Sequence, residues 1–280
     1  MENTSALGTL LAIFIFLSSY KGFRDREYTE EYIFEVDKIL KEKQYYRILS
    51  SGFLHGGWFH LIFNLVALLS FSTSIEEIFG KVKYLVLYFV SLIGGGLLSL
   101  FFHRNHGDYR ALGASGAISG VVFASIVLEP YSTLSLIMIP IEFPAWFFGI
   151  VFILVSIFGI KNSWGNIGHA AHLGGAIVGM LMTIALYPIV LEIHPWVLAA
   201  FLLPCILFFI LLNRYPEMML MSNFLGKKFK EIKSDIQEKK TETKLSPEEE
   251  LNRILDKIRN KGMDSLTLKE KRDLQRLSKR

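Results

Sequence analysis

Residues 110–120 read Arg-Ala-Leu-Gly-Ala-Ser-Gly-Ala-Ile-Ser-Gly and contain the most informative polar group of the chain. Ser115 lies between glycines at the point where an apolar segment begins. A hydroxyl at the N-terminus of a helix lies beside backbone N–H groups without intrahelical partners, at the positive end of the helix dipole. Negative charge is stabilised at such a position. Ser115 is therefore a candidate nucleophile if another part of the chain supplies a base.

The chain has 280 residues, of which 51% are hydrophobic, and many of these lie in long runs almost free of charge. Seven runs are candidate membrane spans: residues 5–20, 58–79, 82–102, 113–129, 145–160, 168–190 and 196–212. The sequence therefore predicts an all-α membrane protein, a polytopic helical bundle. A signal peptide is the alternative for the first run, but a retained span is favoured because no basic region precedes the run. The single cysteine, Cys205, excludes an intrachain disulfide.

The fourth run is too short to cross a membrane. From Ser115 to the Glu129-Pro130 stop it has 14 residues, or about 21 Å of helix, whereas a full span needs about 20 residues. Its first residue is therefore expected below the membrane surface, where irregular backbone is tolerated only inside protein or along a water-filled cavity.

Polar side chains inside membrane spans are costly, so they are candidates for function. His60 and Asn64 are four residues apart in the second run and share one helix face, and His172 lies early in the sixth run. With Ser115, these residues supply what acyl transfer needs: a nucleophile, a general base and donors for an oxyanion.

Glycine spacing predicts how the helices of Ser115 and His172 approach each other. Gly116 and Gly120 form one Gly-x-x-x-Gly pair, and Gly175 and Gly179 form another. Such pairs allow close helix packing in lipid. The second pair follows His172 at i+3 and i+7, so the imidazole is expected on the closely packed face.

Other interpretations of these residues remain open. A Gly-Ala-Ser-Gly stretch also suits helix packing alone, and an intramembrane histidine also suits a hydrogen bond to a neighbouring helix. Ser119 is the alternative nucleophile, although it lies one turn inside the helix, away from the free N–H groups. His169 is the alternative base, but it lacks glycines at the offsets that follow His172.

The chain resembles the rhomboid family of intramembrane serine proteases over about residues 46–180. The resemblance rests on Tyr46-Arg47, His60-Leu-Ile-Phe-Asn64, Gly113-Ala-Ser115-Gly116, and His172-Leu-Gly-Gly175 with Gly179. It implies a six-helix core around a water-filled cavity that opens away from the cytoplasm.

The resemblance also implies a role for each matching residue. Ser115 is the expected nucleophile and His172 its general base, while His60, Asn64 and the N–H group of Ser115 bind the oxyanion. The matching glycines support helix packing, and Arg47 and His55 are expected to be structural residues of the first loop.

Two positions depart from the family pattern. Many relatives carry an aromatic residue four positions after the nucleophile, where it stacks on the base, but this position is Ser119 here. Another group must therefore hold the imidazole. The usual tryptophan before the loop arginine is replaced by Tyr46.

Four aromatic residues of the fifth run suit either a lateral gate or lipid-facing positions: Trp146, Phe147, Phe148 and Phe152.

Composition divides the chain into four parts. They are a first span with a charged loop (1–45), a catalytic core (46–190), an additional C-terminal membrane helix (191–213) and a basic soluble tail (214–280). The Lys-rich residues 222–245 are expected to be flexible. The tail ends in a predicted two-helix hairpin at 246–279, whose second helix begins with a capping box of Thr267 and Glu270.

Two indications of the orientation in the membrane conflict with each other. Counting Lys and Arg places the first loop and the tail in the cytoplasm, whereas the family resemblance places the first loop outside. We follow the resemblance because residues 21–47 contain seven basic and seven acidic side chains. The last apolar run either crosses the membrane or stops short of it, which leaves the side of the tail open. The expected location is the plasma membrane.

The function expected from these residues is an intramembrane serine endopeptidase that cuts transmembrane segments of other membrane proteins through a Ser-His dyad. Its expected partners are those substrates and the lipid bilayer, with no cofactor, metal or nucleic acid. The alternative is a non-catalytic rhomboid-like scaffold that binds and routes membrane proteins. A transporter with a histidine proton relay would need charges along several spans, and the spans contain almost none.

Overall fold

The structure is a computed structural model that describes residues 5–136, 139–162, 167–215 and 247–277. It divides into two compact units, Met1–Met219 and Leu220–Arg280, which are described separately. The stretch 222–245, expected from the sequence to be flexible, lies outside the described residues.

The first unit is a bundle of apolar helices. Among the described residues, five helices are long and apolar enough to cross a membrane: α1 (Ala6–Arg24), α5 (Trp58–His103), α7 (Ala145–Asn162), α8 (His169–Leu186) and α10 (Pro195–Arg214). A shorter apolar helix, α6 (Ser115–Leu128), begins at the candidate nucleophile. The predicted all-α polytopic membrane protein is confirmed.

Two of the expected spans lie in α5. The backbone leaves the helical conformation at Gly80, where φ is 75° and ψ is 165°. This left-handed φ favours glycine, which lacks a Cβ. Ser72 and Tyr84 form a hydrogen bond across the turn, with 2.6 Å between Oγ and the phenol oxygen. The second and third spans therefore form a helical pair joined at a single residue.

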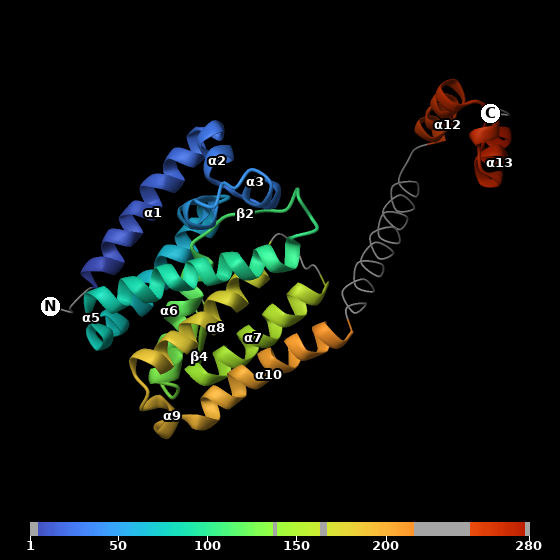
Figure 1. Ribbon diagram of the computed structural model, residues 1–280. Helices are drawn as coiled ribbons and strands as arrows, with labels where there is room; N and C mark the ends of the chain where they lie inside the picture. Colours follow the sequence, from blue (N-terminus) through green and yellow to red (C-terminus); the bar gives the residue numbers. More distant parts are fainter. Residues whose placement is uncertain (1–4, 137–138, 163–166, 216–246, 278–280) are drawn as a thin grey trace. The chain divides into compact units, whose positions relative to one another are not determined.

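Helices α5, α6 and α8 pack on one another and form the centre of the bundle. Figure 1 shows α1 beside α5 on one side of this centre, and α7 and α10 on the other. Large side chains fill the interior, and the largest of those that are completely buried among the described residues are aromatic: Tyr84, Tyr88, Phe123 and Phe201.

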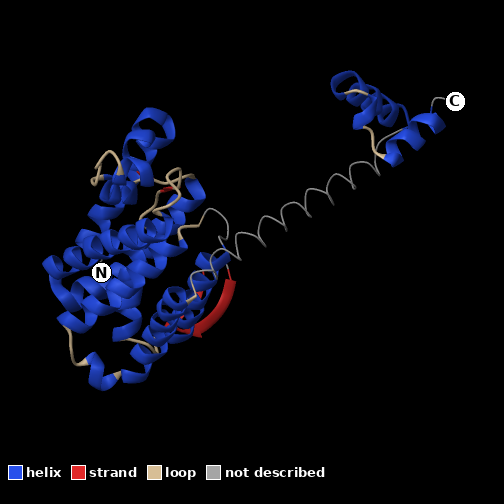
Figure 2. Cartoon of the chain, turned by 45° about the vertical axis from the view of Figure 1, so that its right-hand side comes forward, coloured by secondary structure: helices blue, strands red, loops and turns tan. Residues whose placement is uncertain are grey.

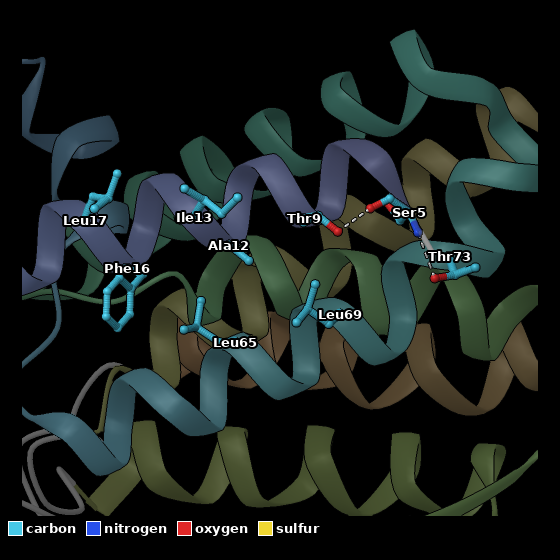
Figure 3. A pocket seen from close by; sticks show the side chains of 9 residues that line it. All are labelled: Ser5, Thr9, Ala12, Ile13, Phe16, Leu17, Leu65, Leu69 and Thr73. Carbon is cyan, nitrogen blue, oxygen red and sulfur yellow. Dashed lines mark hydrogen bonds between the residues drawn. The ribbon is translucent and has the colours of Figure 1, made fainter. Parts of the chain in front are cut away.

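An open groove lies between α1 and the first half of α5. Its walls are mostly apolar and include Ala12, Phe16 and Leu65. At one end the Ser5 N–H group donates a hydrogen bond to Thr73 Oγ1 at 3.2 Å (Figure 3). This contact ties the beginning of α1 to α5.

The loop between α1 and α5 is folded into short elements. These are α2 (Arg26–Tyr32), β1 (Phe34–Glu35), α3 (Val36–Leu40), α4 (Arg47–Ser50) and the 3₁₀ helix η1 (Ser51–Phe53). Strand β1 pairs antiparallel with β2 (Arg110–Ala111), so that Phe34 faces Ala111 and Glu35 faces Arg110. The loop thereby holds the segment that leads to Ser115.

The connection from α6 to α7 forms a β-hairpin of β3 (Thr133–Leu136) and β4 (Ile139–Pro144). Figure 2 shows strand structure at the edge of the helical bundle. A short helix, α9 (Val190–Ile193), precedes α10.

The second unit contains α12 (Pro247–Lys261), the 3₁₀ helix η2 (Met263–Ser265) and α13 (Leu268–Leu277). The Thr267 N–H group donates to Glu270 Oε2 at 2.8 Å, and the Glu270 N–H group donates to Thr267 Oγ1 at 3.3 Å. These are the two reciprocal contacts of a capping box. Lys257 Nζ also donates to both carboxylate oxygens of Glu270, at 2.8 Å each, which ties α12 to the start of α13.

Candidate active site

Ser115 and His172 are brought together by the packing of α6 on α8. Ser115 is the first residue of α6, and His172 lies within the first turn of α8. His172 Nε2 lies 2.7 Å from Ser115 Oγ. This distance lets a neutral imidazole accept the hydroxyl proton, as a general base does for a serine nucleophile. No side chain caps the first turn of α6, because the preceding residue is Ala114.

The glycine pairs of α6 and α8 lie directly against each other. A Cβ added to Gly175 would overlap the carbonyl oxygen of Gly116, and one added to Gly179 would overlap the carbonyl oxygen of Gly120. Backbone therefore packs on backbone at two successive turns. The close approach accounts for the reach of His172 to Ser115.

His60 lies next to the nucleophile on the other side of Gly113. A Cβ at Gly113 would lie 3.0 Å from His60 Nε2 and 3.7 Å from Ser115 Oγ. The imidazole and the hydroxyl thus border the same small space, which the glycine leaves open. Asn64 is buried, and its side-chain amide donates a 2.8 Å hydrogen bond within α5, to the carbonyl oxygen of His60.

Ser119, the alternative nucleophile, and His169, the alternative base, make contacts other than those of Ser115 and His172. Ser119 Oγ donates to the Ser115 carbonyl oxygen at 2.7 Å, a bond within α6. The ring of His169 lies against α7, where a Cβ on Gly159 would overlap it. In the structure it is therefore His172, not His169, that contacts the hydroxyl of Ser115.

His55 links the first loop to the residue before the nucleophile. Its Nε2 accepts a hydrogen bond from the Ala114 N–H group at 3.4 Å, and its Nδ1 lies 2.9 Å from Ser19 Oγ. Because Nε2 is the acceptor, Nδ1 carries the proton and donates to Ser19, which in turn donates to the Phe53 carbonyl oxygen at 3.0 Å. Burial, and to a lesser extent His60, lowers the pKa of His55 from its ordinary 6.5 to about 3.

Arg47 holds the first loop together from inside. The side chain is buried, and its Nη1 donates to the carbonyl oxygens of Glu30 and Ile33 at 2.8 Å each. Its Nε donates to Gln44 Oε1 at 2.6 Å. Removing this side chain would leave the carbonyl oxygens at the end of α2 without these donors.

The segment before Ser115 is attached to the first loop by several bonds that the sequence did not reveal. Besides the β1–β2 pairing, the Gly113 N–H group donates to the Ser51 carbonyl oxygen at 3.0 Å. Arg110 forms ion pairs with Glu30 and Glu35 at 2.6 and 2.7 Å. The pairing brings together residues about 75 positions apart, so no local pattern predicts it.

Of the aromatic residues in α7, Phe147 and Phe158 are exposed, whereas Trp146, Phe148 and Phe152 pack against the core. The ring of Phe152 lies 5.8 Å from the imidazole of His172, measured between centroids, at an interplanar angle of 35°. The sequence indicates Phe152 only as one of several aromatic residues in the fifth run. Its contact with the histidine depends on the packing of α7 on α8.

Comparison with known proteins adds two family matches. Residues 42–189 match a family model described as the Rhomboid domain, and residues 234–280 match one described as a family of unknown function (DUF6576).

Three relatives illustrate the similarity. Rhomboid protein 1, mitochondrial, of Saccharomyces cerevisiae is 35% identical over 48% of this chain and 40% of its own length. RHOMBOID-like protein 12, mitochondrial, of Arabidopsis thaliana is 29% identical over 64% of this chain and 57% of its own. Rhomboid protease GluP of Bacillus subtilis is 27% identical over 63% of this chain and 33% of its own. This chain therefore spans between one third and somewhat over half of these relatives.

Proposed function

Since this chain belongs to the rhomboid family, we propose that it is an intramembrane serine endopeptidase that cleaves transmembrane segments of other membrane proteins. The observation that carries the proposal is the 2.7 Å distance between Ser115 Oγ and His172 Nε2 at the start of a short apolar helix. The similarity to a relative named as a rhomboid protease supports the same activity.

The proposed reaction proceeds through an acyl-enzyme. Ser115 Oγ attacks the carbonyl carbon of the scissile peptide bond while its proton passes to His172 Nε2. The tetrahedral intermediate collapses, the imidazolium gives the proton to the leaving amine nitrogen, and an ester to Ser115 remains. Water then attacks this ester with His172 again as the base, which releases the acid product and restores the hydroxyl.

The oxyanion of the tetrahedral intermediate needs hydrogen-bond donors. The Ser115 N–H group lies in the uncapped first turn of α6, where the helix dipole favours negative charge. We assign the second donor to His60, which borders the same space beside Gly113. Asn64 is the third candidate, because the bond to the His60 carbonyl oxygen uses one of its two amide protons.

The substrates are proposed to share the bilayer of this multi-pass protein. Two of the relatives carry "mitochondrial" in their names, so these relatives do not support the plasma membrane expected from the sequence. The proposal therefore specifies an integral membrane location and membrane-embedded substrates.

Labelling with a fluorophosphonate probe tests the proposal on the full chain in detergent. Wild type is expected to react covalently, whereas Ser115→Ala and His172→Ala are expected to lose labelling while remaining folded. Ser119→Ala is the matched control, because it removes the hydroxyl one turn away and is expected to keep labelling. Labelling of Ser115→Ala at the wild-type rate would disprove the assignment. A folded wild type that neither reacts nor cleaves a transmembrane substrate would indicate the scaffold alternative instead.

A further inference from the structure

The catalytic histidine has an aromatic neighbour on an unexpected helix. One turn after the nucleophile, α6 carries Ser119, whose hydroxyl is bonded to the Ser115 carbonyl oxygen and presents no ring to His172. Among the described residues, two rings lie near this imidazole. The ring of His169, on the same helix, lies 6.3 Å away at an interplanar angle of 77°, and the ring of Phe152 in α7 lies nearer. The centroid distance of 5.8 Å between Phe152 and His172 lies within the range in which aromatic rings attract each other, about 4.5–7 Å.

Phe152 is itself held in place by other rings. It lies 5.3 Å from Phe123 of α6 and 5.8 Å from Phe148 of its own helix, measured between centroids. Phe123 is completely buried and contacts Phe201 of α10 at 5.5 Å. The position of the Phe152 ring is therefore defined from α6 and, through Phe123, from α10.

The small side chain at position 119 fits this arrangement. Ser115, Ser119 and Phe123 are spaced by four residues and so share one face of α6. Ser115 contacts His172 at one end of this face, and Phe123 contacts Phe152 at the other. Ser119 lies between them on this face, so we expect a large ring at position 119 to compete with Phe152 for the space beside His172.

We propose that Phe152 is the positioning residue for His172, so that α7 supports the base in place of a ring from α6. This proposal rests on the proposed function and adds a residue to it. The ring restricts rotation of the imidazole and keeps Nε2 directed at Ser115 Oγ. It also attracts the imidazolium that forms during each proton transfer, since a cation is stabilised by an aromatic face.

A lateral gate is the other role open to an aromatic residue of α7, and labelling with a small probe distinguishes the two. A fluorophosphonate reacts with the Ser-His dyad without requiring a transmembrane helix to enter. Loss of a positioning residue slows labelling, whereas loss of a gate residue leaves labelling unchanged or faster.

The first experiment compares labelling rates of Phe152→Leu, Phe152→Tyr and Phe158→Leu in the full chain. Phe152→Leu is expected to slow labelling roughly 3- to 10-fold, the rate equivalent of one aromatic contact. The kcat for a transmembrane substrate should fall by the same factor with little change in KM. Phe152→Tyr, which keeps the ring, should stay near wild type. Phe158 lies on the same helix and is 53% exposed, so Phe158→Leu serves as the control.

The second experiment places an aromatic ring at position 119 of α6. Ser119→Phe is expected to slow labelling in wild type, because the space is occupied, and to restore it in the Phe152→Ala background. The effect of Ser119→Phe on the labelling rate thus has opposite signs in the two backgrounds, which measures the direct coupling between positions 119 and 152. It also guards against misfolding, since a merely destabilised Phe152→Ala protein would be harmed further by a second core substitution.

Phe152→Leu labelled at or above the wild-type rate would overturn the positioning role and leave the dyad intact. Failure of folded wild type to label at all would instead contradict the proposed function. The labelling rate of Phe152→Leu therefore tests the positioning role, and the labelling of wild type tests the proposed function.

Discussion

Gly113 adopts a backbone conformation that few other residues tolerate, two positions before the candidate nucleophile. Its φ is +131°, and a Cβ there would lie 2.8 Å from His60 Cε1. A side chain would both strain the backbone and displace the imidazole that borders Ser115. At this scale the site depends on one residue's lack of a side chain.

Gly113→Ala is therefore expected to slow fluorophosphonate labelling at least about tenfold and to destabilise the protein by about 1–2 kcal/mol, the usual cost of a left-handed conformation for a residue with a Cβ. Labelling rate and thermal midpoint in detergent measure the two effects. Gly57→Ala is the control, because the backbone there is extended and nothing lies within 4 Å of an added Cβ. Equal behaviour of the two variants would contradict the prediction.

His55 gives the bundle a pH dependence. The pKa of about 3 lies below the ordinary 6.5, so the folded protein binds fewer protons than the unfolded chain between these values. The stabilisation is complete above pH 6.5 and is lost as the pH falls toward 3. His55→Gln keeps an acceptor for the Ala114 N–H group but cannot titrate, so its thermal midpoint should fall less than that of wild type between pH 7 and 4. Parallel midpoints for both proteins would show that His55 does not contribute.

Helix α8 depends on glycine at the scale of whole elements. Gly175 and Gly179 place its backbone against α6, and on its other side a Cβ at Gly95 of α5 would lie 2.6 Å from the Ala171 carbonyl oxygen. Apolar burial contributes little to helix association within lipid, so packing distance has a large influence. The geometry of the dyad is therefore a property of helix packing as much as of two side chains.

Gly175→Ala is expected to push α6 and α8 apart, to destabilise the bundle by about 1–3 kcal/mol as overpacking does, and to slow labelling. Gly168→Ala is the matched control at the start of the same helix, where an added Cβ would meet only the Ala171 Cβ at 3.7 Å. Thermal unfolding and labelling rate are compared for both. A Gly175→Ala protein as stable and reactive as the Gly168→Ala protein would mean that the helices are not as close as described.

The elements differ in how well the sequence predicts them. The spans follow from charge-free runs, and the contact of Ser115 with His172 follows from the spacing of glycines around both residues. The pairing of β1 with β2 and the contact of Phe152 with His172 join segments far apart in the chain. No periodicity encodes such contacts, because they arise only when the helices pack. The serine at position 119 indicated that a support was needed but not which helix would supply it.

At the scale of the whole molecule, the C-terminal unit is held together by the ion pair between Lys257 of α12 and Glu270 of α13. Burial would raise the pKa of the Glu270 carboxyl, but hydrogen bonds from Lys257 and Thr267 outweigh this and lower it to about 2. The carboxylate joins α12 to α13 while ionised.

The four-part division expected from composition remains a prediction, including the additional membrane helix at 191–213.

The hairpin should therefore lose stability as the pH falls from about 4.5, the ordinary value for Glu270, toward 2, because its folded-state pKa is lowered. Hydrogen exchange over residues 247–277 of the full chain measures this. Glu270→Gln should exchange faster than wild type at pH 7 and no differently near pH 2. Asp256→Asn, at an exposed position of α12, is the control. Equal protection of Glu270→Gln and wild type at pH 7 would contradict the assignment.

The turn at Gly80 has a consequence for how the protein is made. One residue connects the two halves of α5, so the end of the first and the start of the second stay at the same depth. We therefore expect the two halves of α5 to enter the bilayer as one helical hairpin, which the hydrogen bond between Ser72 and Tyr84 joins beside the turn.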